Sequence, residues 1–542
     1  MNNATNYNST LINIDVSWLW AGLSGLLCAL AFPPFNLAPL VGCFLIPLLW
    51  AVEGKTIAQG FKLGFFAALC YFSVLLWWLV PTLARFGAME VWIAAPIIGL
   101  LVLYLALFWA IWVVFWIFLQ RNMSARWLIF LSASACWGVL EKCREIFFSG
   151  FPWGNPIYAL SEFSVLLQLL ELIGVHGLVA VLILLNLLSY HAIVFFRAAR
   201  IREGLLLSSV SFALIGVFVL YGTWRVETIR AEDEKAPFIP VAVLQGSFPM
   251  DVKWRPEFQE ETVNRYTQLA RNALNEMQRN SMLSSGDKKI LPLIVMPETA
   301  APFYFQELGP AAQRLLYLAY DLNVWLLFGS LAYVPAPDGG KAMLGQLNSA
   351  YLIDPQPMVL GRYDKRHLVP FGEYLPLDGN LEWLREIFPT AGDFLPGVPD
   401  NIVLKANGLR IGVLICFESI FPELSAEMTR AGARVLAVIT NDAWFGRTGA
   451  PYQHEAMSVF RAIETRRWLL MSANTGVSSI FTPWGKRIGQ TRLFEPGYLV
   501  ADVHLHEGVS FYVKMGYWLV PVILALLAGL GAISAFLNNN NK

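Results

Sequence analysis

The chain has 542 residues, of which 56% are hydrophobic and only 14% are charged, and its mean hydropathy is +0.52. This is too apolar for an enzyme that lies wholly in water, while the middle of the chain is too charged for a membrane bundle. The composition therefore predicts one part in lipid and one part in water. The formal net charge is zero, which gives no sign of nucleic acid or another polyanion as a partner.

Apolar runs fill the first part of the chain and return at its end. Most have about the ~20 residues that a helix needs to cross a bilayer. We expect eight spans, at roughly 16–34, 38–53, 58–82, 88–119, 124–141, 162–196, 204–222 and 517–537. The predicted domains are a region of seven transmembrane helices over 1–235, a water-exposed domain over 236–505, and a C-terminal transmembrane helix and tail over 506–542.

Lysine and arginine residues in the short loops predict the orientation of the chain. One set of alternate loops is the richer in these residues and holds Lys55, Lys62, Arg121, Arg126, Arg197, Arg200 and Arg202. This set should be cytoplasmic, which places the N-terminus inside. After an odd number of spans, the 236–505 domain should lie on the outer side of the membrane, and the tail should return inside.

Strand-like segments alternate with helical patterns between the seventh and eighth apolar runs. Short runs rich in β-branched residues predict strands at 240–245, 291–296, 324–331, 347–353, 409–415, 435–440, 468–473, 478–482 and 498–503. Apolar residues at three- and four-residue steps predict amphipathic helices over 256–279 and 455–467. This alternation is typical of a layered α/β domain.

Cys416 is the candidate nucleophile, because it is the only one of the six cysteines in the predicted water-exposed domain. It ends a strand-like run, and Phe417-Glu418-Ser419 then turns the chain toward a helical pattern. A thiol at such a turn lies beside free backbone N–H groups, which favour a thiolate and can stabilise an oxyanion. The alternative is an inert buried cysteine. Without a CxxC spacing or paired cysteines in this domain, the sequence predicts no metal, no cofactor and no disulfide.

Charged side chains follow two further strand ends. Glu298 follows the run 291–296, and Lys365 follows the run 347–353. If these ends meet Cys416, the carboxylate can take the proton of the thiol and the ammonium can neutralise an oxyanion. Taken singly, Glu298 could be an ordinary strand-end carboxylate and Lys365 a solvated lysine.

Two more carboxylates lie near these positions in the sequence. Glu373 could form a loop salt bridge, and Glu418 could be an acid at a helix N-terminus, where the helix dipole favours it. The combination of all five charged or nucleophilic residues is harder to explain in this ordinary way than any single one of them.

Three motifs together resemble a known family. Pro297-Glu298-Thr299, the run Lys-x-His-Leu-x-Pro-Phe-Gly-Glu from Lys365 to Glu373, and Cys416-Phe417-Glu418 resemble the Glu-Lys-Cys motifs of the nitrilase superfamily. The resemblance covers residues 236–505. With seven spans before it and one after it, the whole chain resembles the apolipoprotein N-acyltransferase family of the bacterial inner membrane. The resemblance implies an α/β fold, a nitrilase-like α-β-β-α sandwich that faces the periplasm, inserted between transmembrane helices seven and eight.

The resemblance also implies roles for single residues. Glu298 would be the general base, Lys365 the oxyanion stabiliser and Cys416 the acylated nucleophile, while Glu373 and Glu418 would support the site.

Aromatic residues complete the set that the resemblance implies. Trp254, Phe371 and Phe417 would support the site or bind substrate, and Trp444-Phe445 is similar to the family's apolar loop that dips into lipid. Core packing is the alternative for that pair. Phe417 stands where the family often has tyrosine, which puts any role of that hydroxyl in doubt.

The implied reaction moves an acyl chain from a phospholipid, typically phosphatidylethanolamine, to the N-terminal amine of a diacylglyceryl-cysteine lipoprotein. The acyl group would pass through a thioester on Cys416, in a monomer that needs no cofactor. Two other classes share part of the pattern. One is a membrane-anchored amidase that hydrolyses a small amide. The other is a transporter or receptor, which would need charges along an intramembrane path, and the predicted spans hold few.

Overall fold

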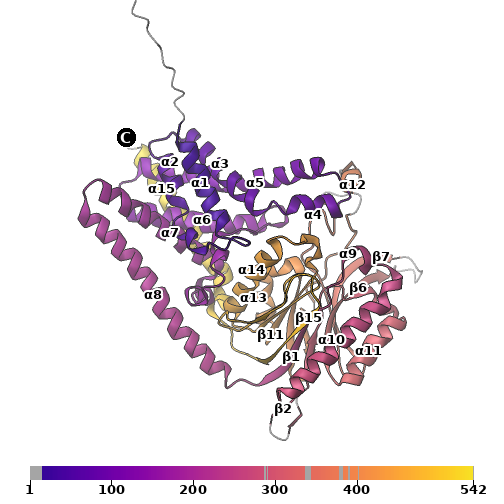
Figure 1. Ribbon diagram of the computed structural model, residues 1–542. Helices are drawn as coiled ribbons and strands as arrows, with labels where there is room; N and C mark the ends of the chain where they lie inside the picture. Colours follow the sequence, from indigo (N-terminus) through magenta and orange to yellow (C-terminus); the bar gives the residue numbers. More distant parts are fainter. Residues whose placement is uncertain are drawn as a thin grey trace, which may run out of the picture.

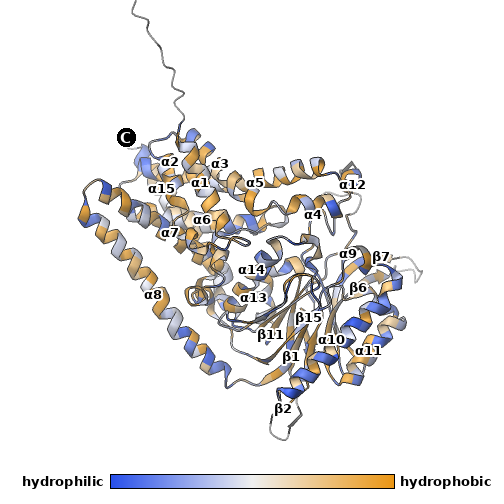
Figure 2. Cartoon of the chain, in the orientation of Figure 1, coloured by the Kyte–Doolittle hydropathy of each residue, from blue (hydrophilic) through white to orange (hydrophobic). Residues whose placement is uncertain are grey.

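The computed structural model describes residues 15–285, 288–289, 291–335, 343–376, 383–388, 391–400 and 402–540. Figure 1 shows two parts, a group of long helices at the upper left and a layered α/β part at the lower right. In Figure 2 the long helices are mostly apolar, whereas α10 (Gln259–Arg279) and α11 (Pro310–Leu322), on the outer side of the α/β part, carry many hydrophilic residues.

The helical part is built from the N-terminal half of the chain and its last helix. Its main helices are α1 (Ser17–Leu30), α2 (Leu45–Val52), α3 (Ile57–Leu75), α4 (Leu79–Phe86), α5 (Val91–Asn122), α6 (Arg126–Ile146), α7 (Leu170–Arg197), α8 (Ile201–Asp233) and α15 (Tyr517–Asn540). Among the described residues, five helices are long and apolar enough to cross a membrane: α3, α5, α7, α8 and the stretch 512–540. The apolar helices at 17–30 and 38–52 are shorter.

One predicted span is divided. The run 58–82, expected as a single helix, forms α3 and α4 with a break after Leu75. Leu76 leaves helical geometry with φ −105° and ψ 11°. Pro81 accounts for the break, because proline lacks an N–H and is tolerated in the first turn of a helix but not in its interior.

The α/β part contains two sheets. The first has the order β15-β1-β4-β6-β7-β8, with β5 paired to β6, and the second has the order β14-β13-β12-β11-β10-β9. The strands of the first sheet are β1 (Phe238–Gln245), β4 (Leu293–Val295), β5 (Ala301–Tyr304), β6 (Trp325–Pro335), β7 (Met343–Ile353), β8 (Val359–Asp364) and β15 (Gly497–His504). Those of the second are β9 (Val403–Ala406), β10 (Leu409–Ile415), β11 (Val435–Thr440), β12 (Leu469–Ala473), β13 (Ser479–Phe481) and β14 (Arg487–Gln490).

Alternation along the strands explains the layers. In β1, Val241 and Val243 belong to the core between the two sheets, whereas Ala242 and Leu244 pack with α10 and α11. All four are fully buried, as expected for strands covered on both faces.

The second sheet is covered by α13 (Pro422–Arg430) and α14 (Ala450–Thr465). In Figure 1 these helices lie between the sheet and the long helices, and α14 contacts α7. The predicted α-β-β-α sandwich is confirmed, and its inner helical layer rests on the helical part.

Every strand predicted from the sequence is present, but some elements were missed. β5, β9 and β14 have only four residues each, and β8, β9 and β14 mix polar with apolar residues, so none of the four shows a long apolar run. The omission of β8 matters for the site, because Lys365 follows β8 directly and not the strand predicted at 347–353. The segment 284–289, expected as a polar loop, contains two paired two-residue strands, β2 (Ser284–Ser285) and β3 (Lys288–Lys289).

Candidate functional site

The two sheets bring Glu298, Lys365 and Cys416 to one place. Glu298 follows β4 and Lys365 follows β8, both in the first sheet, whereas Cys416 follows β10 in the second. Lys365 Nζ lies 4.0 Å from Glu298 Oε1, and the charges of both residues act on the Cys416 thiol. All three side chains are buried, so the group forms a nearly dry centre between the sheets.

On the side of the first sheet, Asn348 links two carboxylates to one ammonium. Its Nδ2 donates to Glu298 Oε1 at 2.7 Å and to Glu373 Oε1 at 3.0 Å. Lys365 Nζ donates to the same Glu373 oxygen at 2.8 Å, and the Val369 N–H donates to Glu373 Oε2 at 2.8 Å. Glu373 therefore holds Lys365 in place beside Glu298. Asn348 was not among the residues predicted from the sequence, although a polar residue within the apolar run 347–353 was a usable signal.

The pKa values of both Glu298 and Lys365 are raised, for different reasons. Burial raises the pKa of Glu298, and Glu373 raises it further, while Lys365 and Asn348 oppose the shift. Burial alone would lower the pKa of Lys365, but Glu373 and Glu298 outweigh it and raise that pKa. Lys365 is therefore a fixed cation. The raised pKa suits Glu298 to take up a proton, and its Oε2 is buried without a partner among the described residues.

Cys416 is held as a thiol in the resting site. Burial raises its pKa well above the usual value, as does the Glu298 charge, while Lys365 lowers it. Because only the thiolate attacks a carbonyl efficiently, this cysteine needs a base at the moment of reaction. Among the carboxylates, Glu298 has the largest effect on the pKa of this thiol.

Each of the three motifs contains a residue with a strained backbone. Thr299 (φ 47°), Phe371 (φ 63°) and Cys416 (φ 53°) are non-glycine residues in the left-handed region. Each costs on the order of 1–3 kcal/mol, and such strain collects at functional sites. The turn at Glu298 also needs a close neighbour without a side chain, because a Cβ on Gly329 would lie 2.5 Å from the Thr299 nitrogen.

Both carboxylate oxygens of Glu418 accept hydrogen bonds. Its Oε1 accepts from the N–H groups of Arg366 (2.7 Å) and His367 (3.2 Å) and from the Tyr363 hydroxyl (2.9 Å). Its Oε2 accepts from the Ile415 N–H at 2.8 Å. Burial raises the pKa of Glu418, and the backbone donors oppose the shift. The carboxylate thus ties the loop after Lys365 to the strand that ends at Cys416.

A second buried lysine supports the turn that carries Glu298. Lys253 Nζ donates to the Glu298 carbonyl at 3.1 Å and to Thr299 Oγ1 at 2.7 Å. Burial lowers the pKa of Lys253 to about 7, with Glu298 opposing the shift. Only the neighbouring Trp254, and not Lys253, was predicted from the sequence to belong to the site.

The predicted aromatic residues occupy different environments. Phe417 is buried, with its ring centroid 5.2 Å from Phe421 and 5.8 Å from His367. Trp254 and Phe371 are 40% and 43% exposed. The ring of Phe417 packs the site whether or not a hydroxyl is present.

The Trp444-Phe445 pair lies on the helical part. The Trp444 carbonyl accepts from Thr82 Oγ1 at 3.0 Å, and its ring meets Phe86 edge-on at 4.6 Å. Trp444 is nevertheless 38% exposed. Phe445 packs edge-on against Trp78 at 4.8 Å. One residue of the pair is therefore open to its surroundings and the other is anchored in the core.

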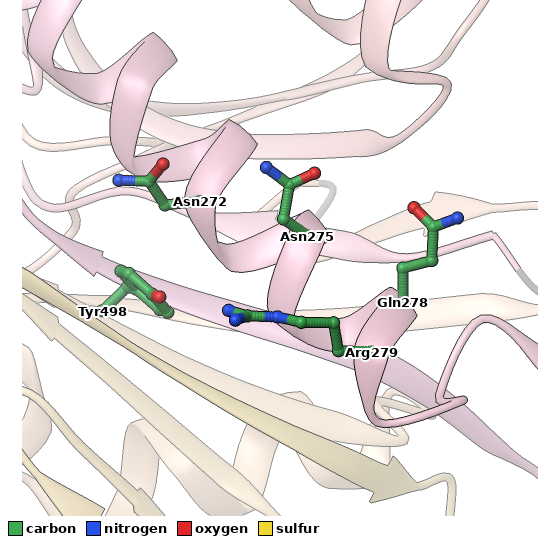
Figure 3. Close-up of a pocket in the computed structure, with 5 residues that line it drawn as sticks. All are labelled: Asn272, Asn275, Gln278, Arg279 and Tyr498. Carbon is green, nitrogen blue, oxygen red and sulfur yellow. The ribbon is translucent and has the colours of Figure 1, made fainter.

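Two grooves lie outside this centre. Figure 3 shows a polar groove of about 590 Å³ on α10 and β15, lined by Asn272, Asn275, Gln278, Arg279 and Tyr498. These side chains include no thiol and no carboxylate, and the groove contains none of the predicted site residues. An apolar groove of about 440 Å³ lies among α3, α4 and α5 and includes Trp77 and Val80.

Two family models match the chain. The model of the carbon-nitrogen hydrolases matches residues 241–511, which is half of the chain, and that of the apolipoprotein N-acyltransferase N-terminal domain matches residues 24–188. The two matches correspond to the α/β part and to most of the long helices.

Curated relatives match over nearly the whole length. The apolipoprotein N-acyltransferase of Geobacter metallireducens is 39% identical and covers 92% of this chain and 91% of its own. The apolipoprotein N-acyltransferase of Nitrosomonas europaea is 31% identical and covers 93% of this chain and 95% of its own. Among solved structures, an amidase of the nitrilase superfamily from Nesterenkonia sp. AN1 is 21% identical, with a TM-score of 0.36, and covers 52% of this chain and 95% of its own.

Proposed function

The chain belongs to the apolipoprotein N-acyltransferase family, and on that premise we propose that Cys416 carries the acyl group during the reaction. In this proposal a membrane phospholipid acylates Cys416, and the thioester then acylates the N-terminal amine of an S-diacylglyceryl-cysteine apolipoprotein. The observation that carries the proposal is the meeting of a buried thiol, a carboxylate of raised pKa and a fixed ammonium.

In the first step Glu298 takes the thiol proton while sulfur attacks the ester carbonyl carbon of the phospholipid. The carbonyl oxygen becomes an oxyanion, and the ammonium of Lys365 stabilises it. Collapse of the tetrahedral intermediate breaks the ester C–O bond. Glu298 returns the proton to the leaving alkoxide, so a lysophospholipid departs and the acyl group remains on Cys416.

In the second step the uncharged amine of the acceptor attacks the thioester. Glu298 takes a proton from the attacking nitrogen, and Lys365 again neutralises the oxyanion. The C–S bond breaks, an amide forms, and the thiolate recovers its proton from Glu298. Sequential use of one site by two bulky lipids explains why a covalent intermediate is useful here.

The supporting residues have two roles: the carboxylates position Lys365, and the aromatic residues contact lipid or pack the core. Glu373 keeps Lys365 beside Glu298, and Glu418 fixes the loop that carries Lys365. Trp254, Phe371 and Trp444 are exposed enough to meet lipid, whereas Phe417 is buried and Phe445 is partly buried against the core.

The proposed setting is the bacterial inner membrane, with eight spans and the catalytic domain in the periplasm. Residues 1–235 and 506–542 would form the membrane region and residues 236–505 the catalytic domain, in a monomer that takes phosphatidylethanolamine as donor. Five long apolar helices and the loop charge bias support this placement. A reporter that is active only outside the membrane should work when fused near residue 290 and fail when fused near Arg200.

Transfer to a defined acceptor tests the function. The full-length protein in phosphatidylethanolamine vesicles should add one acyl chain to a synthetic diacylglyceryl-cysteine peptide, measured by mass spectrometry. Cys416→Ala should insert into the membrane and transfer nothing. Release of free fatty acid from the donor without acylation of the peptide would instead favour a hydrolase.

A further inference from the structure

A chain of buried polar side chains lies directly beneath Cys416. Thr440 Oγ1 donates to Asp442 Oδ1 at 2.7 Å, and His454 Nδ1 lies 3.0 Å from the same oxygen. On the other side of the ring, His454 Nε2 lies 2.8 Å from Ser419 Oγ, which donates to the Cys416 carbonyl at 2.9 Å. All of these side chains are at most 1% exposed. Bulk water does not reach them, so their polar atoms need hydrogen-bond partners within the protein.

This row of hydrogen-bonded side chains ends at the backbone carbonyl of Cys416 and not at its thiol. His454 Nε2 lies 3.3 Å from the Cys416 carbonyl, in addition to its contact with Ser419. Cys416 adopts φ 53°, a conformation that a non-glycine residue keeps only when its surroundings hold it there. Ser419 and His454 supply that hold at the carbonyl.

The ring of His454 is itself immobilised. Trp153 stacks on it at 5.9 Å, and Phe445 meets it edge-on at 6.1 Å. The preceding residue of α14, Gln453, accepts from Trp153 Nε1 at 2.8 Å and donates to the Pro33 carbonyl at 2.9 Å. The imidazole is therefore fixed between the second sheet and the helical part.

The proposed reaction leaves this group unused. Glu298 handles the proton and Lys365 the oxyanion, and both come from the first sheet. The two ring nitrogens of His454 face Asp442 on one side and Ser419 on the other, and the Ser419 hydroxyl donates to the Cys416 carbonyl.

We propose that His454 is a positioning residue, which through Nε2 and Ser419 fixes the main chain of Cys416 so that the thiol faces the acyl carbonyl. Asp442 orients the ring through Nδ1. The inference rests on the proposed acyl-enzyme function. A misplacement of about 1 Å can cost on the order of 10²-fold in rate, so this hold contributes to kcat without touching substrate.

The two ring nitrogens can be tested separately. In His454→Gln the longer amide reaches the Nε2 position and keeps a donor for Ser419, while contact with Asp442 is lost. In His454→Asn the shorter amide reaches the Nδ1 position and keeps a partner for Asp442, while contact with Ser419 is lost. Asp442 Oδ2 is already buried without a partner among the described residues. Loss of the Nδ1 contact in His454→Gln should therefore reduce stability more than loss of the Nε2 contact in His454→Asn.

The experiment measures acylation of Cys416 by phosphatidylethanolamine vesicles in single turnovers, with the full-length chain and intact-protein mass spectrometry. We expect the Asn variant to be slowed about ten-fold or more, with the lipid concentration at half-maximal rate unchanged. The Gln variant should stay within a few-fold of the wild-type rate, although it melts at a lower temperature than the Asn variant. Ser458→Ala, one turn further along α14 and equally buried, is the control and should keep the full rate.

Opposite outcomes overturn the inference. It is wrong if the Asn variant acylates at the full rate, or if rate follows melting temperature so that the Gln variant is the slower one. If either variant does not fold, Ser419→Ala decides, because it removes the bridge and leaves the ring and Asp442 in place. A full rate in Ser419→Ala rejects the inference, and a lower kcat at unchanged half-saturation supports it. Absence of acyl-Cys416 in the wild-type chain would instead reject the proposed function.

Discussion

The two sheets contribute to the site in different ways. The first sheet supplies Glu298, Lys365 and Glu373, whose side chains interact with one another directly. The second sheet supplies Cys416, whose main chain and flanking residues are held by Ser419, His454 and Glu418. In the proposed mechanism, the half of the site on the first sheet therefore controls charge, and the half on the second sheet controls geometry.

This division has a physical basis. Charges in a dry centre act over several ångströms, so the acid-base group tolerates small displacements when its partners remain paired. Attack of sulfur on carbon requires a close, aligned approach, which depends on the position of a single backbone turn. We therefore expect changes in the first sheet to alter rate and pH dependence, and changes in the second to alter rate together with stability.

Glu298→Gln should have the largest effect on the charge half. The amide keeps the shape and can still contact Asn348, but it cannot take the thiol proton, so acylation should fall ~10²–10⁴-fold. Intact-protein mass spectrometry after incubation with phospholipid measures this. Glu423→Gln, at a partly buried ion pair with Lys142 outside the centre, should change little. Near-normal acylation in Glu298→Gln would assign the base to another residue.

Lys365→Met should slow acylation by ~10²–10³-fold, because the oxyanion loses its cation. Lys365→Arg is the matched variant: it keeps the charge but places it differently, so its rate should fall between those of the Met variant and the wild type. Single-turnover acylation gives the rates, and membrane insertion is the control for folding. If the Met variant keeps the full rate, backbone N–H groups alone stabilise the oxyanion.

Glu418→Gln should affect stability as well as rate. An amide leaves at least one of the buried N–H donors of Ile415, Arg366 and His367 without an acceptor, at a cost of about 1–3 kcal/mol. Thermal melting in detergent should show the loss. Glu427→Gln breaks only an ion pair with Arg366 in which the Glu427 side chain is 38% exposed, and it should leave the melting temperature nearly unchanged. Equal effects of the two changes would contradict the bracing role.

Glu373→Gln should shift the pH dependence with a smaller change in maximal rate. The base must be ionised to react, so acylation declines as pH falls through the raised pKa of Glu298. Glu373 contributes to that rise, and without its negative charge the pKa of Glu298 should be lower. The acid limb of the rate profile should therefore move to lower pH. If the acid limb stays in place or moves to higher pH, the charge of Glu373 does not raise the pKa of the catalytic base.

Those parts of the fold and site that have a local sequence pattern could be predicted from the sequence. Strands such as 409–415 and 435–440 were identifiable because apolar β-branched runs are short and bounded, and the three motifs mark the ends of strands. β8 escaped prediction because its residues are mixed in polarity and half exposed. Lys253 and Asn348 escaped because their partner Glu298 lies 45 and 50 positions away, and His454 escaped because its role depends on the chain turn at Cys416.

The most direct test of the account separates the two half-reactions. The full-length protein is incubated with phosphatidylethanolamine vesicles alone, and its mass is measured before and after hydroxylamine, which cleaves thioesters. The account predicts one acyl chain on Cys416, removed by hydroxylamine, absent in Cys416→Ala and nearly absent in Cys416→Ser, and transferred to the amine when a diacylglyceryl-cysteine peptide is added. Acyl transfer that survives Cys416→Ala, or that releases no lysophospholipid until donor and acceptor are both present, would contradict it.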